Sequence, residues 1–258
     1  MTIDDKWARR ISRAVDAAGH ETFYGALADV LCIGVEVDYV IAFVFRLANI
    51  PQVVHHTLRG RKLRAELDDY VNGLYVLDPL YNSIQRGQSS GVYAIRELMP
   101  DNFTTSEFFR RFWKPLGFVD RVDVIVRLPH HGGHLVLYLE RTETKRKFSK
   151  REIAQLRIIE PLIGALARNH WRIGSRSDDQ DENKKWTVPT LDTFGSRDLT
   201  KREREVAQLI LSGHSSESIA RNLSISPNTV WVHRKHVYSK LRVSSQAELF
   251  HLFLKGIS

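Results

Sequence analysis

The alternation of apolar and polar positions divides the chain into helix-like and strand-like segments. Amphipathic helical spacing covers residues 6–18, 21–33, 64–75 and 105–117. Runs of β-branched and aromatic residues predict strands over 38–46, 52–58, 91–98, 121–128 and 134–141. Asp78-Pro79 begins another helix, with aspartate at the N-cap and proline at the first helical position. Ser149 caps a long helix that ends near Trp171.

The order αββααβαββα predicts an antiparallel sheet flanked by helices, the α+β sensor fold of PAS and GAF domains. Residues 174–196 are polar, contain Gly, Ser and Pro, and lack apolar periodicity, so they are interpreted as a linker. We therefore expect a sensor and dimerisation domain over 1–173 and a small all-α domain over 197–258.

The last 62 residues have the pattern of a helix-turn-helix. Thr200 and Glu203 form a capping box for a helix that ends at Gly213. A short helix begins near Ser216, and after a tight turn Ser226-Pro227 starts a longer helix to about Leu241. A final helix runs from 244 or 245 to about 254. A short helix, a turn and a basic helix predict major-groove recognition of duplex DNA.

Charge strengthens this interpretation. The chain has a formal charge of +8, and residues 197–258 hold 10 Lys and Arg against 5 Asp and Glu. No acidic residue lies between Glu217 and Glu248. A helical bundle with a solvated basic face is the alternative interpretation. The turn spacing, the Ser-Pro start and the missing acids together favour a polyanionic partner, duplex DNA.

The phase of the longer helix predicts which side chains meet DNA. At about 100° per residue, Val230, Val237 and Leu241 form a packed stripe. The free side supplies the candidate DNA contacts, which are Asn228, Thr229, Trp231, Val232, Lys235, His236, Ser239, Lys240 and Arg242.

This segment resembles the LuxR-type helix-turn-helix domain. The family pattern is met, among others, by Leu199, Thr200, Arg202, Glu203, Glu205, Val206, Gly213, Ile219, Ala220, Leu223, Ser226, Thr229, Val230, His233, Lys240, Leu241 and Ala247. The resemblance implies binding of promoter DNA, usually by dimers, and we expect a homodimer. Trp231 departs from the family, in which many members carry Lys at this position.

The N-terminal part is similar to the autoinducer-binding domains of the same regulators. The similarity rests on Tyr70, Tyr75, Asp78-Pro79, the aromatic segment 108–113 with Gly117, and the last two strands. It implies a small-molecule effector whose amide N–H donates to Asp78. The candidate ligand residues are Tyr70, Tyr75, Asp78, Tyr93, Phe109 and Trp113.

Two positions set this chain apart from regulators that answer acyl-homoserine lactones. Lys62 and Glu66 stand near where those regulators have Tyr and Trp. We expect a LuxR solo that answers a different small molecule. A ligand-independent dimerisation or protein-interaction module remains the alternative.

Other classes find no support in the sequence. The single cysteine, Cys32, excludes a disulfide framework and a Cys-rich zinc site. His130, His131 and His134 belong to a Gly-rich turn, so no metal and no cofactor is expected. There is no P-loop and no local catalytic triad, and an enzyme is not expected. No run of about 18 apolar residues exists, so we expect a cytoplasmic protein with no membrane partner.

Overall fold

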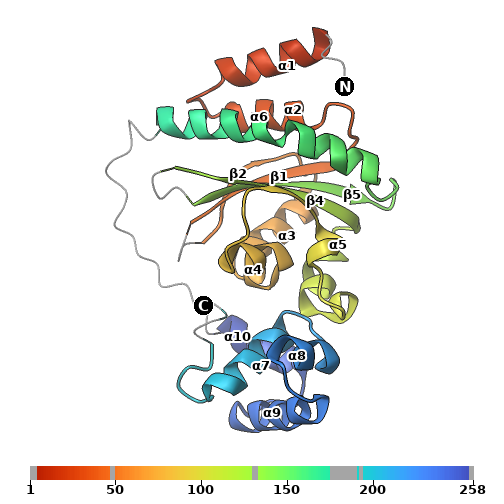
Figure 1. Ribbon diagram of the computed structural model, residues 1–258, viewed down its shortest axis with the longest axis vertical. Helices are drawn as coiled ribbons and strands as arrows, with labels where there is room; N and C mark the ends of the chain where they lie inside the picture. Colours follow the sequence, from red (N-terminus) through yellow and green to blue (C-terminus); the bar gives the residue numbers. More distant parts are fainter. Residues whose placement is uncertain (1–4, 47–49, 130–132, 175–190, 192–193, 256–258) are drawn as a thin grey trace. The chain divides into compact units, whose positions relative to one another are not determined.

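The computed structural model describes residues 5–46, 50–129, 133–174, 191 and 194–255. Helices and strands alternate as the polar pattern predicts, in the order α1(Asp5–Asp16), α2(Phe23–Leu31), β1(Tyr39–Phe45), β2(Gln52–His56), α3(Arg61–Val71), η1(Leu74–Leu77), α4(Pro79–Gln85), β3(Gly91–Ala94), α5(Ile95–Leu98), η2(Phe103–Thr105), η3(Phe109–Trp113), β4(Phe118–Arg127), β5(His134–Thr142) and α6(Lys150–Gly174). Four helices follow, α7(Lys201–Leu211), α8(Ser216–Leu223), α9(Pro227–Lys240) and α10(Gln246–Lys255). The α+β class with a helical C-terminal part is confirmed (Figure 1).

The strands form one antiparallel sheet in the order β2-β1-β5-β4-β3. One face of the sheet is apolar and is covered by α2 and α6, as Figure 1 shows. The core on this face takes alternate strand residues, including Val40 and Ala42 of β1, Val124 of β4 and Leu137 of β5. This period of two is what the strand pattern predicts for a sheet with a helix-covered face.

Two segments differ from the expected secondary structure. The expected strand 91–98 is a strand only over Gly91–Ala94 and continues as the short helix α5. The expected helix 105–117 is replaced by η2 and a π-helix, η3, in which Lys114 N–H donates to Phe109 C=O at 2.8 Å. A π-turn widens the helix by one residue per turn, and apolar spacing alone does not reveal it.

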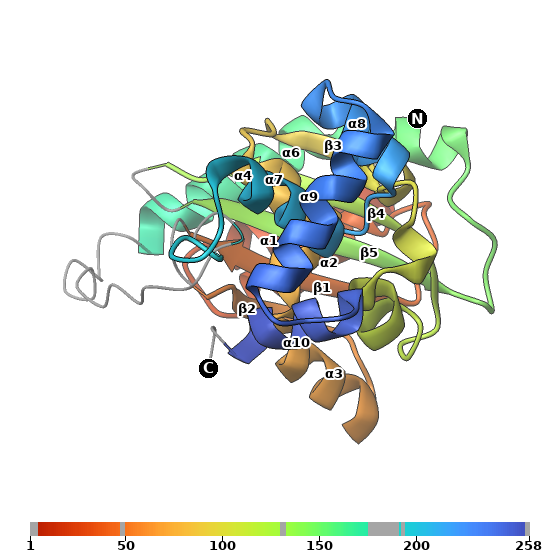
Figure 2. The ribbon, with the colours of Figure 1, turned by 90° about the horizontal axis from the view of Figure 1, so that it is seen from below.

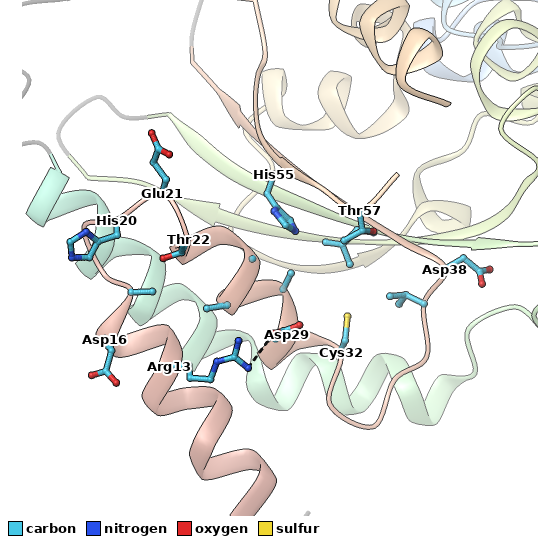
Figure 3. Close-up of a pocket in the computed structure, with 16 residues that line it drawn as sticks. Arg13, Asp16, His20, Glu21, Thr22, Asp29, Cys32, Asp38, His55 and Thr57 are labelled. Carbon is cyan, nitrogen blue, oxygen red and sulfur yellow. Dashed lines mark hydrogen bonds and ion pairs between the residues drawn. The ribbon is translucent and has the colours of Figure 1, made fainter. Parts of the chain in front are cut away.

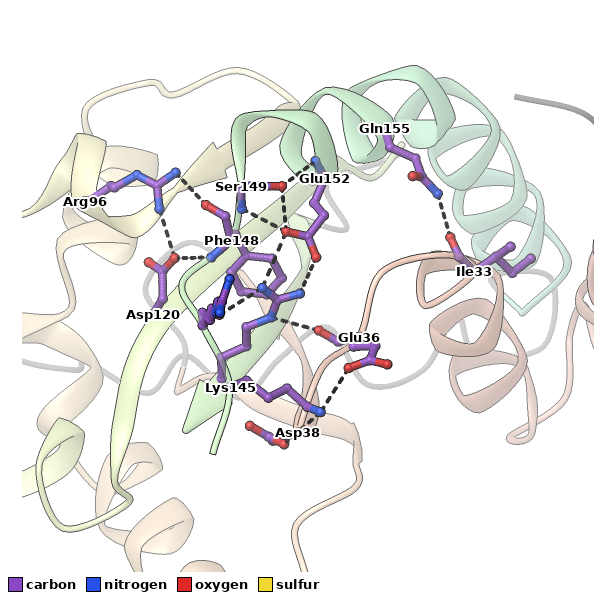
Figure 4. Close-up of polar contacts among 12 residues, drawn as sticks. Ile33, Glu36, Asp38, Arg96, Asp120, Lys145, Phe148, Ser149, Glu152 and Gln155 are labelled. Carbon is purple, nitrogen blue, oxygen red and sulfur yellow. Dashed lines mark hydrogen bonds and ion pairs between the residues drawn. The ribbon is translucent and has the colours of Figure 1, made fainter. Parts of the chain in front are cut away.

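A polar network fixes the start of α6 to the sheet (Figure 4). Ser149 and Glu152 form the predicted capping pair, and Glu152 also accepts hydrogen bonds from Arg141 of β5. Burial alone would raise the pKa of Glu152. The hydrogen bonds from Arg141 and Ser149, with the charge of Arg141, lower that pKa to about 2. Beside it, Asp120 accepts from Arg96 at 2.9 Å and from Phe148 N–H at 2.8 Å.

The described residues fall into two compact units. The first holds the sheet with α1, α2 and α6, within Met1–Ala65, Gly87–Glu97 and Gly117–Trp186. The second holds α3 from Glu66 onward, α4, η2, η3 and the four C-terminal helices, within Glu66–Arg86, Leu98–Leu116 and Thr187–Ser258. The division into 1–173, 174–196 and 197–258 stays a prediction, and the linker 174–196 lies almost wholly outside the described residues.

Candidate nucleic-acid interface and effector site

Helix α9 is set by local sequence at both ends. Ser226 is its N-cap and accepts a hydrogen bond from Thr229 N–H at 3.1 Å, with Pro227 at the first helical position. At the other end Arg242 takes a left-handed conformation with φ 54°, and its N–H donates to Ser239 C=O at 3.2 Å. These caps fix where the helix starts and stops, and so which side chains share a face.

The helices α7 and α8 hold α9 from one side. Val230 and Val237 of α9 are fully buried, and α9 packs on both of these helices. Arg202 of α7 donates to Leu223 C=O at the end of α8 at 2.5 Å, and pairs with Glu205 at 2.8 Å. Ser224 then turns the chain with φ 54° between α8 and α9. The arrangement is a helix-turn-helix braced by a third helix, which Figure 2 shows.

Glu203 links the start of α7 to the end of α9. It completes the predicted capping box by accepting from Thr200 N–H at 2.8 Å, and it also accepts from Lys240 Nζ at 2.7 Å. Burial opposes ionisation of Glu203, but the hydrogen bonds from Lys240 and Thr200, with the charge of Lys240, lower its pKa to about 2. His236 Nδ1 lies 3.8 Å from the same carboxylate.

The structure leaves the expected DNA face of α9 open. Every candidate DNA contact is exposed, namely Asn228, Thr229, Trp231, Val232, Lys235, His236, Ser239, Lys240 and Arg242. Two of them are directed in part toward α7, since Lys240 and His236 approach Glu203. The rest form a surface of polar donors and cations with two large apolar side chains among them.

Asp78 occupies the N-cap of α4, as predicted. It is fully buried, and its Oδ1 accepts from Leu80 N–H at 2.9 Å. Its Oδ2 accepts from the Tyr70 hydroxyl at 3.1 Å. The cap role is confirmed, while a role in ligand binding stays a prediction.

Tyr75 carries a polar atom that the described residues do not satisfy. Its side chain is 1% exposed, and its hydroxyl has no hydrogen-bond partner among them. Burial, followed by the neighbouring Tyr81, raises its pKa, so the hydroxyl stays protonated and can donate or accept. The ring centroids of Tyr75 and Tyr70 are 6.4 Å apart.

The same unit holds an aromatic cluster around Tyr70 that is larger than the sequence analysis proposed. The ring of Phe112 lies tilted at 4.7 Å from that of Tyr70, and the ring of Phe108 lies 6.4 Å from it, edge to face. Phe103, Phe108, Phe112 and Tyr81 were not predicted as individual members of this cluster. Phe112 lies in the π-helix η3 and the other three lie outside it, so the apolar spacing of one regular helix does not show which rings turn inward.

The remaining candidate ligand residues have different surroundings. Trp113 is 2% exposed and meets Phe103 edge to face at 5.4 Å. Phe109 is half-buried and contacts the same ring at 5.6 Å. Tyr93 lies on β3 in the first unit, and its hydroxyl donates to Ser89 C=O at 3.1 Å. Tyr70, Tyr75, Asp78, Phe109 and Trp113 therefore belong to one unit, and Tyr93 belongs to the other.

A groove of about 860 Å³ in the first unit was not anticipated (Figure 3). The end of α1, α2 and strands β1 and β2 line it, with small side chains such as Gly25 and Ala28 in its wall. Cys32 and His55 also line it. Burial first, and then Asp29, raise the pKa of Cys32 to about 11, so the thiol is protonated at neutral pH and does not act as a nucleophile.

Within the described part of the chain, no three His, Cys, Asp or Glu side chains are grouped to hold a metal ion. His130 and His131 lie outside that part, while burial and then Arg127 lower the pKa of His134 on β5. Among described helices, none has the length and apolar character needed to cross a bilayer.

Comparison with known proteins agrees with both parts of the fold. The family model "Bacterial regulatory proteins, luxR family" matches residues 197–253. A putative HTH-type transcriptional regulator in the exeN 3'region of Aeromonas salmonicida is 33% identical over 187 residues, covering 70% of this chain and 94% of that protein. UhpA of Salmonella typhimurium is 47% identical over 58 residues, which are 22% of this chain and 30% of UhpA. The solved LBD domain of VqsR from Pseudomonas aeruginosa has a TM-score of 0.56 and 21% identity, covering 66% of this chain and 99% of that one.

Proposed function

Because the chain belongs to the luxR family of bacterial regulatory proteins, we propose that its C-terminal helices bind duplex promoter DNA and that a small-molecule effector in its N-terminal part controls this binding. The chain is a transcriptional regulator by this membership, and the fold of its N-terminal part is similar to that of the VqsR LBD domain. The effector, the DNA-contacting residues and the homodimer are proposed in addition to this membership.

The observation that carries the DNA-binding proposal is the division of α9 into two faces. Val230 and Val237 are fully buried, while the candidate contacts on the other face are all exposed. That face holds Lys235 and the amide of Asn228, and no carboxylate lies between Glu217 and Glu248 to repel phosphate. Cations and amides are the groups that bind phosphates and base edges in the major groove.

A binding selection tests this proposal with the full chain. Random duplexes that bind the protein are enriched and sequenced, and the affinity for the enriched site is compared with that for random DNA. Lys235→Ala should cost about 1–3 kcal/mol on the enriched site and relax specificity at one position if Lys235 contacts a base.

Lys150→Ala is the matched control, because Lys150 is an exposed lysine at the start of α6. It should bind as the wild type does. Failure to enrich any duplex would contradict the DNA-binding proposal. Equal losses for Lys150→Ala and Lys235→Ala would contradict the assignment of the contact face to α9.

The effector proposal rests on the residues around the start of α4. A buried carboxylate, Asp78, and a buried hydroxyl, Tyr75, lie in the same unit among aromatic rings. Small-molecule sites are mostly apolar, with a few polar groups that fix the orientation of the ligand. A buried hydroxyl without a partner costs about 1–3 kcal/mol, and a ligand that hydrogen-bonds to it recovers part of that cost.

A homodimer completes the proposal. One helix-turn-helix contacts few bases, so its affinity alone is modest. Two modules held in one dimer gain effective concentration on a two-fold symmetric site. The half-sites should then lie about 10–10.5 base pairs apart, centre to centre.

A further inference from the structure

Two large apolar side chains stand next to each other on the open face of α9. Trp231 is 70% exposed and Val232 is 52% exposed. Within the described part of the chain, no aromatic or cation–π contact involves Trp231. Tryptophan is one of the largest apolar side chains, and when it stays exposed to water the favourable free energy of burying it is not gained. A bound partner that covers these two side chains would gain this apolar burial.

The pair lies in the part of α9 that faces the bases in a helix-turn-helix bound to DNA. Trp231 and Val232 are the fifth and sixth residues of α9 and lie about 100° apart around its axis. Lys235 is four residues beyond Trp231 and points between them. Residues in the first turns of a recognition helix are those that reach the base edges in the major groove.

Charge identifies the partner as DNA rather than an apolar protein surface. Lys235 and Arg242 are exposed on the same side of α9 as the pair, and the stretch between Glu217 and Glu248 has no acidic residue. Polyanionic duplex DNA fits these cations. In the major groove, the apolar group available to a side chain is the C5-methyl of thymine.

We infer that Trp231 and Val232 read thymine C5-methyl groups, and that this contact is a determinant of sequence specificity in this chain. The inference rests on the proposed DNA-binding function and adds the chemical feature that is recognised. Lys235 lies about 6 Å further along the helix axis than Trp231. It is placed to donate to the O6 and N7 acceptors of a guanine within about two base pairs of the thymine.

Replacement of thymine by deoxyuridine tests the inference, since it removes only the methyl group. The probe is the duplex enriched by the full-length protein, with each thymine replaced in turn. We expect one or two positions in each half-site at which deoxyuridine weakens binding about fourfold, the value of one buried methyl or methylene group. Thymines outside the half-sites should tolerate the replacement.

Variants assign the effect to side chains. Trp231→Ala and Val232→Ala should each bind the thymine and deoxyuridine forms of one position equally. Lys235→Ala is the control, because it should weaken both forms and leave their ratio unchanged. Circular dichroism melts confirm that the exposed substitutions leave the fold intact.

The outcomes separate the inference from the function on which it rests. Specific binding without any deoxyuridine-sensitive position would overturn the methyl contact and leave DNA binding standing. A deoxyuridine penalty that persists in both Trp231→Ala and Val232→Ala would overturn the assignment to these residues. Absence of any duplex binding would instead contradict the proposed function.

Discussion

Substitutions of single side chains near the start of α4 distinguish a role in stability from a role in effector binding. Tyr75→Phe removes a buried hydroxyl that has no partner among the described residues. The free energy of unfolding without effector should therefore stay the same or rise by up to about 1 kcal/mol. Stabilisation by an effector should fall, because the hydroxyl is the group we expect it to use.

Thermal melts of the full chain with a small-molecule extract of the producing cells measure both effects. Asp78→Asn is the companion variant, since asparagine still caps α4 but lacks the carboxylate. N-octanoyl-homoserine lactone should produce no shift in Tm. An extract that stabilises the wild type and Tyr75→Phe equally would remove Tyr75 from the effector site.

The carboxylate of Glu203 makes the stability of the second unit depend on pH. Its pKa is about 2 in the folded chain, against an ordinary value of 4.5. The unfolded chain thus takes up a proton first as the pH falls. The stabilisation is fully present above about pH 5 and is lost progressively as the pH approaches 2.

Glu203→Gln should therefore lower the free energy of unfolding at pH 7 and have a much smaller effect at pH 2, measured by urea unfolding. Glu152→Gln is the parallel variant in the first unit, where the pKa of Glu152 is also about 2. A loss of the same size at both pH values would show that the charge of Glu203 is not what stabilises the link between α7 and α9.

At the scale of elements, the sequence predicts helices and strands best where a capping residue or a strict period is present. Thr200, Ser226 and Asp78 all cap helices as predicted, because an N-cap depends on a local hydrogen bond. The antiparallel pairing of β4 with β5 is also as expected from the Gly-rich sequence between them. Gly133, just before β5, has φ 77°, and a Cβ at this position would clash with Phe45 C=O.

Elements that depend on distant contacts escape this kind of prediction. The segment 91–98 changes from strand to helix at Ile95. Nothing in a short apolar run marks the position of such a change, because a strand and a buried helix share this pattern. The same limit applies to the candidate sites. The exposed face of α9 follows from helical phase, whereas the orphan hydroxyl of Tyr75 depends on what tertiary packing places around it.

The final helix α10 offers less free surface than its sequence indicates. Leu249, Phe250 and Phe253 are all buried within the second unit, and Phe253 meets Phe194 edge to face at 5.3 Å. Ala247 is exposed and Leu252 is half-buried. This leaves α6 as the better of the two surfaces expected to form a dimer.

At the scale of the whole molecule, the open side of α6 has the symmetry that a two-fold contact needs. Ile158 is 66% exposed, and Ala154, Pro161 and Ala165 are exposed along the same side of the helix. These four positions are spaced evenly about a point between Ile159 and Glu160. A two-fold interface uses the same surface of both copies, so an antiparallel pair would set Ala154 against the partner's Ala165 and Ile158 against the partner's Pro161.

The register of the two antiparallel α6 helices can be measured by cross-linking. Ala154→Cys together with Ala165→Cys should be cross-linked between protomers by a bis-maleimide shorter than the span of about 16 Å that separates the two positions within one helix. Each single variant should be cross-linked poorly, because in this antiparallel pair Ala154 lies far from the partner's Ala154 and Ala165 lies far from the partner's Ala165. The wild type supplies the background from Cys32, whose raised pKa slows its reaction with a maleimide. Ile158→Glu should shift the sedimenting species from dimer to monomer at micromolar concentration. Val15→Glu is the control, because Val15 is an apolar residue on α1 that is 50% exposed, and it should leave the dimer intact.

A wild-type monomer both with and without the enriched duplex would contradict the homodimer itself. A dimer that Ile158→Glu leaves unchanged would place its interface away from α6.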